Sequence, residues 1–357
     1  MYALDPAELK KFLHYYLMES YKLRNQILLG DSLSILKNIK NDTFDLVITS
    51  PPYFQQRNYG NVKLGVGNEE KENEYVENLI AIFNACVRTT KKDGALVFNV
   101  GDKYLDGKLS LIPYKFAIRA LENKDVFLVN QLTWSKLNPT PRQEKRKLIQ
   151  ATEPFFIFAK SKDYHFDLQS YLSHLDTINK AGKKNPTDRL GKKYFTLIEE
   201  SDLGKEQKEK ARKALTETIL AVKNGEIESF RMKISGLHKL AYGGQSGGRN
   251  GQIKNNGFTI IKLLGNKMKK DVIESPVEIT KDNPHPAVYP LYIIQELIKL
   301  LSESGDLILD PFCGSGTTCL AAKNLNRYYL GIEINPDYVA LANKRLKKTD
   351  YAQELFV

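Results

Sequence analysis

Two short segments hold residues whose types and spacing could perform chemistry, and they lie far apart in the chain. The first is Ser50-Pro51-Pro52-Tyr53, which follows the apolar run 44–49. The second is the glycine turn 310–317, between an apolar run and a helical pattern. A hydroxyl on a proline-locked loop can hold a reacting group, and a glycine turn lets the backbone approach a ligand closely. The two segments predict a reaction site and a ligand site on one sheet, in inverted order along the chain.

The glycine turn is typical of a cofactor site. A helix that begins near Thr317 offers free amide donors, but the turn contains no lysine and is therefore not a phosphate-binding P-loop. Glu333 ends the following apolar run, about twenty residues later, where an acidic side chain accepts hydrogen bonds from ribose hydroxyls. We expect an adenosine cofactor without phosphates. The alternative is an ordinary tight turn with an exposed glutamate.

The elements that position these segments follow from the spacing of apolar residues. A proline pair lacks two backbone donors and cannot continue a central strand, so 50–53 must be a loop at a strand's end, where α/β sheets bind ligands. The patterns predict alternating strands and helices. The expected strands are 26–30, 44–49, 95–100, 126–134, 154–159, 306–309 and 328–332, and the expected helices are 32–39, 75–89, 205–223, 290–301, 317–324 and 336–347.

Length and composition limit the class of protein. The chain has 357 residues, enough for one large lobe and a smaller one, and 42% of its residues are hydrophobic. No run approaches the roughly 20 apolar residues of a membrane span. The first 24 residues do not have the pattern of a secretory signal. We expect a cytoplasmic protein with no membrane partner.

The charge predicts a polyanionic partner. The formal net charge is +11, and residues 166–284 hold 22 Lys and Arg against 15 Asp and Glu. This third of the chain is the expected partner-binding surface. Its glycine run 243–251 lacks the Lys-Ser/Thr pair of a phosphate cradle and favours a flexible loop.

Cysteines and histidines predict neither a disulfide framework nor a metal site. The three cysteines are Cys86, Cys313 and Cys319, and the five histidines have no ligand spacing. We expect no metal. No cysteine follows a proline in the reaction loop, so covalent catalysis by a cysteine nucleophile is excluded there.

The two segments together resemble a known family. Residues Asp310-Pro311-Phe312-Cys313-Gly314-Ser315-Gly316-Thr317 resemble the S-adenosylmethionine motif of DNA amino-methyltransferases. Residues 48–53 resemble their catalytic motif in the Ser-Pro-Pro-Tyr form, which in that family is associated mostly with cytosine N4. Weaker matches at 30–31, 134–139, 153–155 and 285–286 extend the resemblance to about 24–165 and 284–348. The order of the motifs resembles the family's permuted beta group.

The resemblance implies the fold and its division. The expected fold is α/β: a circularly permuted, Rossmann-like S-adenosylmethionine-dependent methyltransferase with a mixed seven-stranded sheet and an inserted target-recognition region. Residues 1–165 are the expected catalytic half and 285–357 the cofactor-binding half. Residues 166–284 are the expected target-recognition region.

The resemblance also assigns site residues. Ser50, Pro51, Pro52 and Tyr53 are the expected catalytic residues. Acceptors at Ser50 Oγ and at the Ser50 or Pro51 carbonyl would hold the two amino hydrogens, so that the nitrogen lone pair faces the methyl group. Tyr53 would stack on the flipped base. The expected cofactor-binding residues are Asp31, Thr49, Asp310, Pro311, Phe312, Gly314, Ser315, Gly316, Thr317, Glu333 and Asn335, and the expected DNA-binding residues are Lys136, Arg142, Lys145, Arg146, Lys147 and Arg249.

The implied function is site-specific methylation of cytosine N4 in double-stranded DNA, with S-adenosyl-L-methionine as cofactor and base flipping. In a restriction–modification system a cognate endonuclease would act separately, and the methyltransferase itself would be a monomer or a homodimer. Three alternatives remain: adenine N6 methylation on the same fold, a catalytically inactive DNA-binding subunit, and RNA methylation.

Overall fold

The computed structural model describes residues 22–55, 65–139, 146–173, 190–227, 229–238, 249–263, 269–277 and 289–354. Contacts divide the chain into two compact units. The first comprises Met1–Tyr171 with Lys270–Val357, and the second is Leu172–Lys269. In the described part of the chain, no helix combines the length and the apolar character needed to span a membrane.

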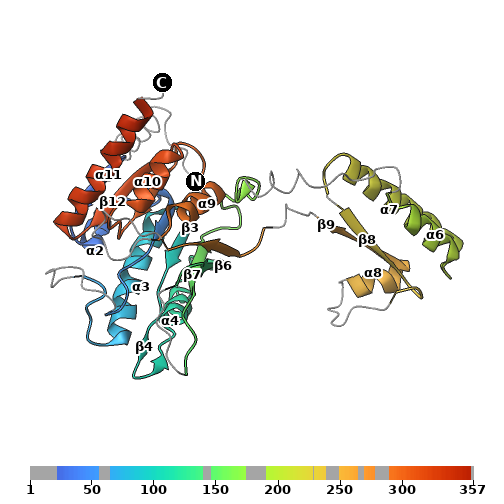
Figure 1. Ribbon diagram of the computed structural model, residues 1–357, viewed down its shortest axis with the longest axis horizontal. Helices are drawn as coiled ribbons and strands as arrows, with labels where there is room; N and C mark the ends of the chain where they lie inside the picture. The colour runs from blue at the N-terminus through green and yellow to red at the C-terminus, as the bar shows by residue number, and fades with distance from the viewer. Residues whose placement is uncertain are drawn as a thin grey trace, which may run out of the picture. The chain divides into compact units, whose positions relative to one another are not determined.

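An eight-stranded sheet forms the centre of the first unit (Figure 1). In spatial order the strands are β1 (Gln26–Leu29), β12 (Tyr328–Glu333), β11 (Leu307–Asp310), β2 (Phe44–Thr49), β3 (Thr90–Asn99), β7 (Thr152–Ala159), β6 (Phe127–Lys136) and β10 (Val272–Ser275). Only β7 runs antiparallel to its two neighbours. The fold class is as predicted, but the sheet has eight strands rather than seven. The additional strand is β10, a short segment without a clear apolar pattern, which pairs with the edge strand β6.

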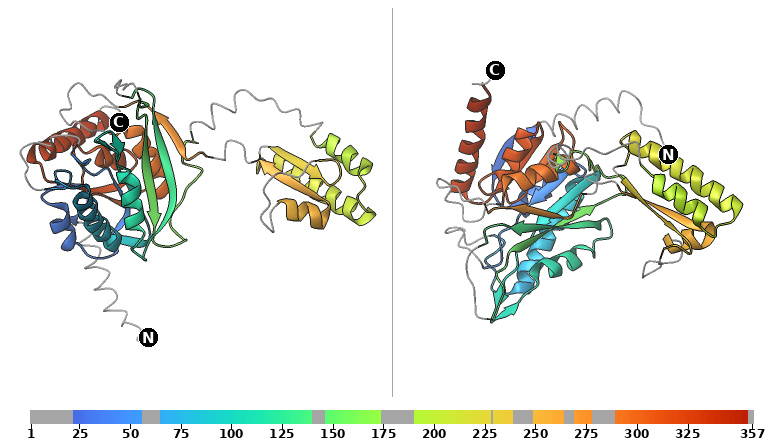
Figure 2. Two further views of the ribbon diagram at one scale, coloured as in Figure 1. Left: turned by 90° about the horizontal axis from the view of Figure 1, so that it is seen from below. Right: turned by 45° about the vertical axis from the view of Figure 1, so that its right-hand side comes forward.

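Helices cover both faces of this sheet (Figures 1 and 2). One layer, in blue to green, is α2 (Ser32–Lys37), α3 (Glu72–Thr89) and α4 (Ile112–Ala120). The other, in orange and red, is α9 (Leu291–Leu301), α10 (Thr317–Asn324) and α11 (Pro336–Glu354). The central strands are therefore buried on both faces, which explains their continuous apolar runs.

A large apolar cluster of the first unit lies between the sheet and the layer of α2, α3 and α4. Phe83 of α3 meets Phe98, Phe116 and Phe158 edge to face, with ring centroids 5.3, 5.7 and 5.0 Å apart. Such aromatic contacts add stability beyond their area burial. Phe98 directly precedes Asn99, so these contacts help to fix the end of β3, which borders the site described below. A small hairpin of β4 (Tyr104–Leu105) and β5 (Lys108–Leu109) leads from β3 towards α4.

The sheet brings several chain segments to one edge. β11 and β2 are parallel neighbours paired through Leu309 and Val47, so their carboxyl ends lie together. The strand order reverses between them: the strand that follows β11 in the chain, β12, lies on one side, and the strand that follows β2, β3, lies on the other. In open α/β sheets ligands bind at such a switch point. β7 runs the opposite way, so its beginning meets the ends of β3 and β6 at the same edge.

The second unit has its own apolar core. A two-stranded antiparallel sheet of β8 (Ser229–Ile234) and β9 (Phe258–Leu263) packs with α6 (Lys192–Glu200), α7 (Lys205–Lys223) and α8 (Arg249–Asn256). Ile198, Ala211, Leu215 and Ile234 are buried in it. This unit lies within the segment 166–284, while β10, from the end of that segment, belongs to the first unit.

Candidate active site

The glycine loop follows β11 and ends at the first residue of α10. Gly316 caps the helix with φ +80°, in the left-handed region. A Cβ on Gly316 would lie 2.9 Å from Cβ of Ala342 in α11. Both the backbone conformation and this close approach require glycine. Arg345 of α11 stabilises the loop, because its guanidinium donates to the Ser315 carbonyl at 2.6 Å and to the Ser315 hydroxyl at 2.8 Å.

Asp310 joins the glycine loop to the neighbouring strand β2. Its side chain, in a residue that is 2% exposed, accepts hydrogen bonds of 2.6 Å from the hydroxyls of Thr49 and Thr318. Oδ1 also accepts from the amide of Phe312 at 3.1 Å, and Oδ2 from the Tyr289 hydroxyl at 3.2 Å. Burial raises the pKa of Asp310, and these donors counteract the shift. The carboxylate thus holds the start of both loops in a fixed relation.

Glu333 closes the other side of the loop from the end of β12. Its Oε2 accepts from the amide of Gly314 at 2.9 Å and its Oε1 from the amide of Asn335 at 2.9 Å. Burial raises the pKa of Glu333, while the amides of Asn335 and Gly314 lower it. Each carboxylate oxygen keeps a further lone pair that could accept a hydroxyl hydrogen of a ligand.

The loop 50–53 follows β2 and is held in place by contacts with α3. Phe54, 3% exposed, packs its ring 5.5 Å from that of Tyr75 in α3. The Tyr75 hydroxyl donates to the Pro52 carbonyl at 3.0 Å. Because Pro51 and Pro52 cannot donate from their nitrogens, this carbonyl contact and the buried Phe54 fix the loop without any strand pairing.

Tyr53 points into a polar cluster at the ends of β3, β6 and β7. Its hydroxyl lies 2.8 Å from Asn99 Oδ1 and 2.8 Å from Glu153 Oε2, and Ser50 Oγ lies 3.2 Å from Asn99 Oδ1. Lys136 forms an ion pair with Oε1 of Glu153. The ring of Tyr53 fills the space above Gly101, where a Cβ would come within 2.3 Å of the ring carbons.

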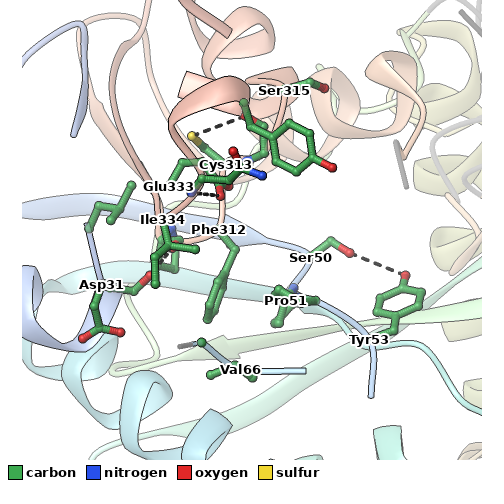
Figure 3. Close-up of a pocket in the computed structure, with 18 of the residues that line it drawn as sticks. Asp31, Ser50, Pro51, Tyr53, Val66, Phe312, Cys313, Ser315, Glu333 and Ile334 are labelled. Atoms are coloured by element: carbon green, nitrogen blue, oxygen red, sulfur yellow. Dashed lines mark hydrogen bonds between the residues drawn. The ribbon is translucent and has the colours of Figure 1, made fainter. Parts of the chain in front are cut away.

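One pocket connects the two loops (Figure 3). Asp31 lies at one end and Ser50 with Tyr53 at the other, with the Phe312 ring directed between them. The lining residues are Asp31, Ser32, Ser50, Pro51, Pro52, Tyr53, Gly65, Val66, Asn68, Tyr289, Pro311, Phe312, Cys313, Gly314, Ser315, Thr317, Ile332, Glu333, Ile334, Asn335 and Tyr338. The pocket therefore has a polar end with carboxylates, an aromatic middle, and an end with hydroxyls.

Most residues predicted for cofactor and catalysis line this pocket, and three do not. Thr49 and Asp310 bond to each other below it, and Gly316 faces α11, so these three shape the loops and do not line the pocket. Asp31 also caps α2, because its Oδ1 accepts from the Ser34 amide at 2.9 Å. Among the described residues, no three His, Cys, Asp or Glu side chains gather as a metal site would need.

The predicted DNA-binding residues are spread over several places. Lys136 is paired with Glu153, with only 15% of its side chain exposed, so a phosphate contact would have to replace that partner. Arg146 is exposed, and the Lys147 ammonium lies 4.6 Å from the centroid of the Tyr104 ring. Arg249 begins α8. Arg142 and Lys145 lie outside the described residues.

Sequence reasoning missed several residues at the site. Asn99 and Glu153 contact Tyr53, while Tyr289 and Tyr338 line the pocket. A signal existed for Asn99, since it is a polar residue at the end of the predicted strand 95–100. Glu153 belongs to the weak family match at 153–155, but no local pattern predicted its contact with Tyr53, because only the antiparallel direction of β7 brings its beginning to this edge.

Comparison with known proteins identifies a family model that matches most of the chain. The model, described as a DNA methylase of the N6 and N4 type, matches residues 44–344. Among characterised relatives, the type II methyltransferase M.SmaI of Serratia marcescens is 24% identical and aligns over 92% of this chain and 93% of its own. M.PvuII of Proteus hauseri is 26% identical, over 91% and 84%.

Solved structures share the fold. The cytosine-N4-specific PvuII DNA methyltransferase superposes with a TM-score of 0.56 at 19% identity, over 89% of this chain and 84% of that one. The DNA modification methylase TTHA0409 of Thermus thermophilus, solved with S-adenosyl-L-methionine, superposes with a TM-score of 0.50 at 20% identity, over 90% and 93%.

Proposed function

The chain belongs to the N6 and N4 DNA methylase family, and from this premise we propose that it methylates N4 of cytosine in duplex DNA. The methyl donor is S-adenosyl-L-methionine. One observation carries the proposal: the loop 50–53 and the glycine loop line a single pocket. The hydrogen bond from Thr49 to Asp310 connects the starts of the two loops. The choice of cytosine rests on the Ser-Pro-Pro-Tyr form of the loop, and it is supported by the similarity to the PvuII enzyme, which is cytosine-N4-specific.

The chemistry of the pocket suits the cofactor. Glu333 would accept hydrogen bonds from the ribose hydroxyls, and Phe312 would pack against the adenine ring, with Asp31 at the polar end. This orientation directs the other end of the cofactor, which carries the sulfonium methyl group, towards Ser50.

The target amine needs help before it can attack. Its lone pair is delocalised into the cytosine ring, so acceptors must hold its hydrogens and localise the pair. Ser50 Oγ and the Ser50 or Pro51 carbonyl would do this, while Pro51 and Pro52 keep the loop rigid. The nitrogen then forms a bond to the methyl carbon as the carbon–sulfur bond breaks, and the amine proton leaves to solvent. The ring of Tyr53 would stack on the cytosine after it has swung out of the duplex.

The second unit, Leu172–Lys269, lies in the basic third of the chain, and we assign target recognition to it. Arg249 at the start of α8 and the exposed Arg146 are the proposed phosphate contacts. DNA of a bacterial cell is the substrate, so the proposed compartment is the cytoplasm. A separate endonuclease is the expected partner if the enzyme protects a restriction site.

The decisive experiment is expression in a host without DNA methylation. Genomic DNA is digested to nucleosides, and modified bases are identified by mass spectrometry and mapped. N4-methylcytosine at a recurring sequence is expected. N6-methyladenine would replace the base assignment, and unmodified DNA together with normal DNA retention would favour a catalytically inactive binding subunit. Competition between duplex DNA and RNA tests the substrate.

A further inference from the structure

A line of polar side chains with little solvent exposure lies behind Tyr53, and the methyl-transfer scheme above does not use it. Lys136 pairs with Oε1 of Glu153, and Oε2 of the same carboxylate is 2.8 Å from the Tyr53 hydroxyl. The two charged side chains are 15% and 13% exposed. On its other side, the Tyr53 hydroxyl meets Asn99 Oδ1, which also faces Ser50 Oγ.

The amide of Asn99 has a fixed orientation. Its Nδ2 donates to the Pro154 carbonyl at 3.0 Å, and the residue is completely buried. Turning the amide over would place its oxygen against the Pro154 carbonyl oxygen and leave that buried carbonyl without a donor, which is costly. Oδ1 of Asn99 therefore faces Ser50 and Tyr53 as an acceptor.

A count of hydrogens decides how the cluster is connected. Tyr53 has one hydroxyl hydrogen and two acceptors at 2.8 Å, Asn99 Oδ1 and Glu153 Oε2. The hydrogen can point to only one of them, and the other contact is then between two oxygen atoms. A carboxylate that is ion-paired with Lys136 is a stronger acceptor than a neutral amide oxygen, so the hydrogen belongs to Glu153.

With the Tyr53 hydrogen on Glu153, Ser50 does not share Oδ1 of Asn99 with a second donor. This oxygen is the nearest acceptor for the Ser50 hydroxyl hydrogen, at 3.2 Å, whereas the Tyr53 hydroxyl oxygen lies 3.5 Å from Ser50 Oγ. Both lone pairs of Ser50 Oγ then remain available to the pocket that Ser50 lines. A serine oriented in this way accepts the hydrogen of a substrate amine, whereas a freely rotating hydroxyl would compete by donating.

We propose that Glu153, held by Lys136, is a positioning residue for methyl transfer: it takes the Tyr53 hydrogen, so that Tyr53 does not compete with Ser50 for Oδ1 of Asn99 and Ser50 faces the target amine as an acceptor. The inference rests on the proposed function. It gives Lys136 a role different from the phosphate contact predicted from the sequence. The Tyr53 ring packs against Gly101, where a Cβ would come within 2.3 Å of the ring carbons, and this packing holds the ring that carries the hydroxyl.

The test is a double-mutant cycle. Lys136→Met/Glu153→Leu removes both charges together and leaves no unpaired ion. It should lower kcat for transfer of labelled methyl groups to unmethylated genomic DNA by about tenfold, the value of one hydrogen bond of roughly 1.4 kcal/mol. In a Tyr53→Phe background, where the phenol hydrogen is already absent, the same pair of substitutions should change kcat less than twofold. Equal losses in both backgrounds would overturn the proposal.

Reversing the pair separates positioning from stability. Lys136→Glu/Glu153→Lys keeps an ion pair but presents an ammonium to the Tyr53 hydroxyl, so kcat should fall as in the neutral variant. Recovery of kcat in the reversed pair would show that only the ion pair matters. Trp134, the chain's single tryptophan, lies 5.1 Å from the Lys136 ammonium and reports local packing. Its emission should keep the wavelength of a buried indole in all variants that are compared.

A matched control and an independent readout complete the test. Lys115→Met/Glu72→Leu makes the same change in an ion pair between α4 and α3, and kcat should stay within about twofold. The ¹³Cζ resonance of Tyr53, assigned with Tyr53→Phe, should shift in the neutral variant as the hydrogen changes acceptor; an unmoved resonance would count against the proposal. If the wild type transfers no methyl group, the proposed function fails, and this resonance alone decides the positioning role.

Discussion

The hydroxyl of Thr49 donates a hydrogen bond of 2.6 Å to Oδ1 of Asp310, although 261 residues separate them. Thr49 is the last residue of β2 and Asp310 the last of β11. The bond therefore joins the start of the loop 50–53 to the start of the glycine loop. Because both side chains are buried, the relative position of the two loops is fixed before any ligand binds.

Thr49→Val should break this connection with little change in shape. The buried carboxylate loses one donor, so the free energy of unfolding should fall by about 1–3 kcal/mol, and kcat should fall as the loops lose their common anchor. Urea denaturation and methyl-transfer kinetics measure the two effects. Thr216→Val is the control, because its exposed hydroxyl bonds only to the helix carbonyl of Arg212 and should change stability by less than about 0.5 kcal/mol.

Ser50→Ala should reduce kcat by about 10²-fold and leave the affinities for cofactor and DNA nearly unchanged. The physical reason is that the proposed bond from the amine to Ser50 Oγ strengthens as the nitrogen becomes pyramidal. Steady-state kinetics with separate binding measurements would check this. Comparable losses in binding and turnover would mean that Ser50 only shapes the loop.

The raised pKa of Glu333 predicts how cofactor binding depends on pH. The ionised carboxylate is the proposed ribose acceptor, so affinity should decline as pH falls through the pKa of Glu333, which burial raises above its ordinary value. Calorimetric titration with S-adenosylhomocysteine, which has the ribose but no sulfonium charge, measures it. Glu333→Gln should bind more weakly with a flat profile across this range; an unchanged slope would assign the titration to another group.

The same shift affects stability with a definite sign. Without cofactor, the folded state holds the Glu333 proton more tightly than the unfolded state does. The contribution of Glu333 to the free energy of unfolding therefore decreases as pH rises from its ordinary pKa through the raised one. Glu333→Gln should make the unfolding free energy less dependent on pH in this window, as urea titrations at several pH values would show.

Gly316→Ala should weaken cofactor binding and destabilise the fold. An alanine at φ +80° is strained by about 1–2 kcal/mol, and its Cβ would also meet Ala342 at 2.9 Å. Gly107→Ala has nearly the same φ of +78° but nothing within 4 Å, so it measures the strain alone. Gly316→Ala should therefore lower the free energy of unfolding by more than Gly107→Ala does. Equal losses would show that α11 can shift away from the new methyl group at no measurable cost.

DNA binding should depend steeply on salt, because the chain has a formal charge of +11. Retention of duplex DNA, measured between about 50 and 200 mM salt on a logarithmic scale, gives the slope. Arg146→Met should reduce that slope by about 0.9 if the exposed guanidinium contacts one phosphate. An unaltered slope would place the phosphate contacts elsewhere on the basic surface.

Local sequence determined much of this protein. The proline pair after an apolar run and the glycine turn before a helix gave the two loops, because proline and glycine restrict the backbone locally. The resemblance they carry predicted family membership and the α/β class, and both are confirmed. The predicted strands 44–49 and 328–332 and the helix 205–223 agree with the structure within one residue. The helix α4 and the strand β10 were missed, since neither has a long apolar period.

Only the tertiary structure decided which polar side chains meet. In the sequence, Lys136 was one member of a predicted set of DNA-binding residues, and Glu153 was only part of a weak family match. The antiparallel pairing of β7 with β6 sets Glu153 opposite Trp134, so that its carboxylate reaches both Lys136 and Tyr53. Strand direction and register depend on the whole sheet, and therefore no local pattern contains them.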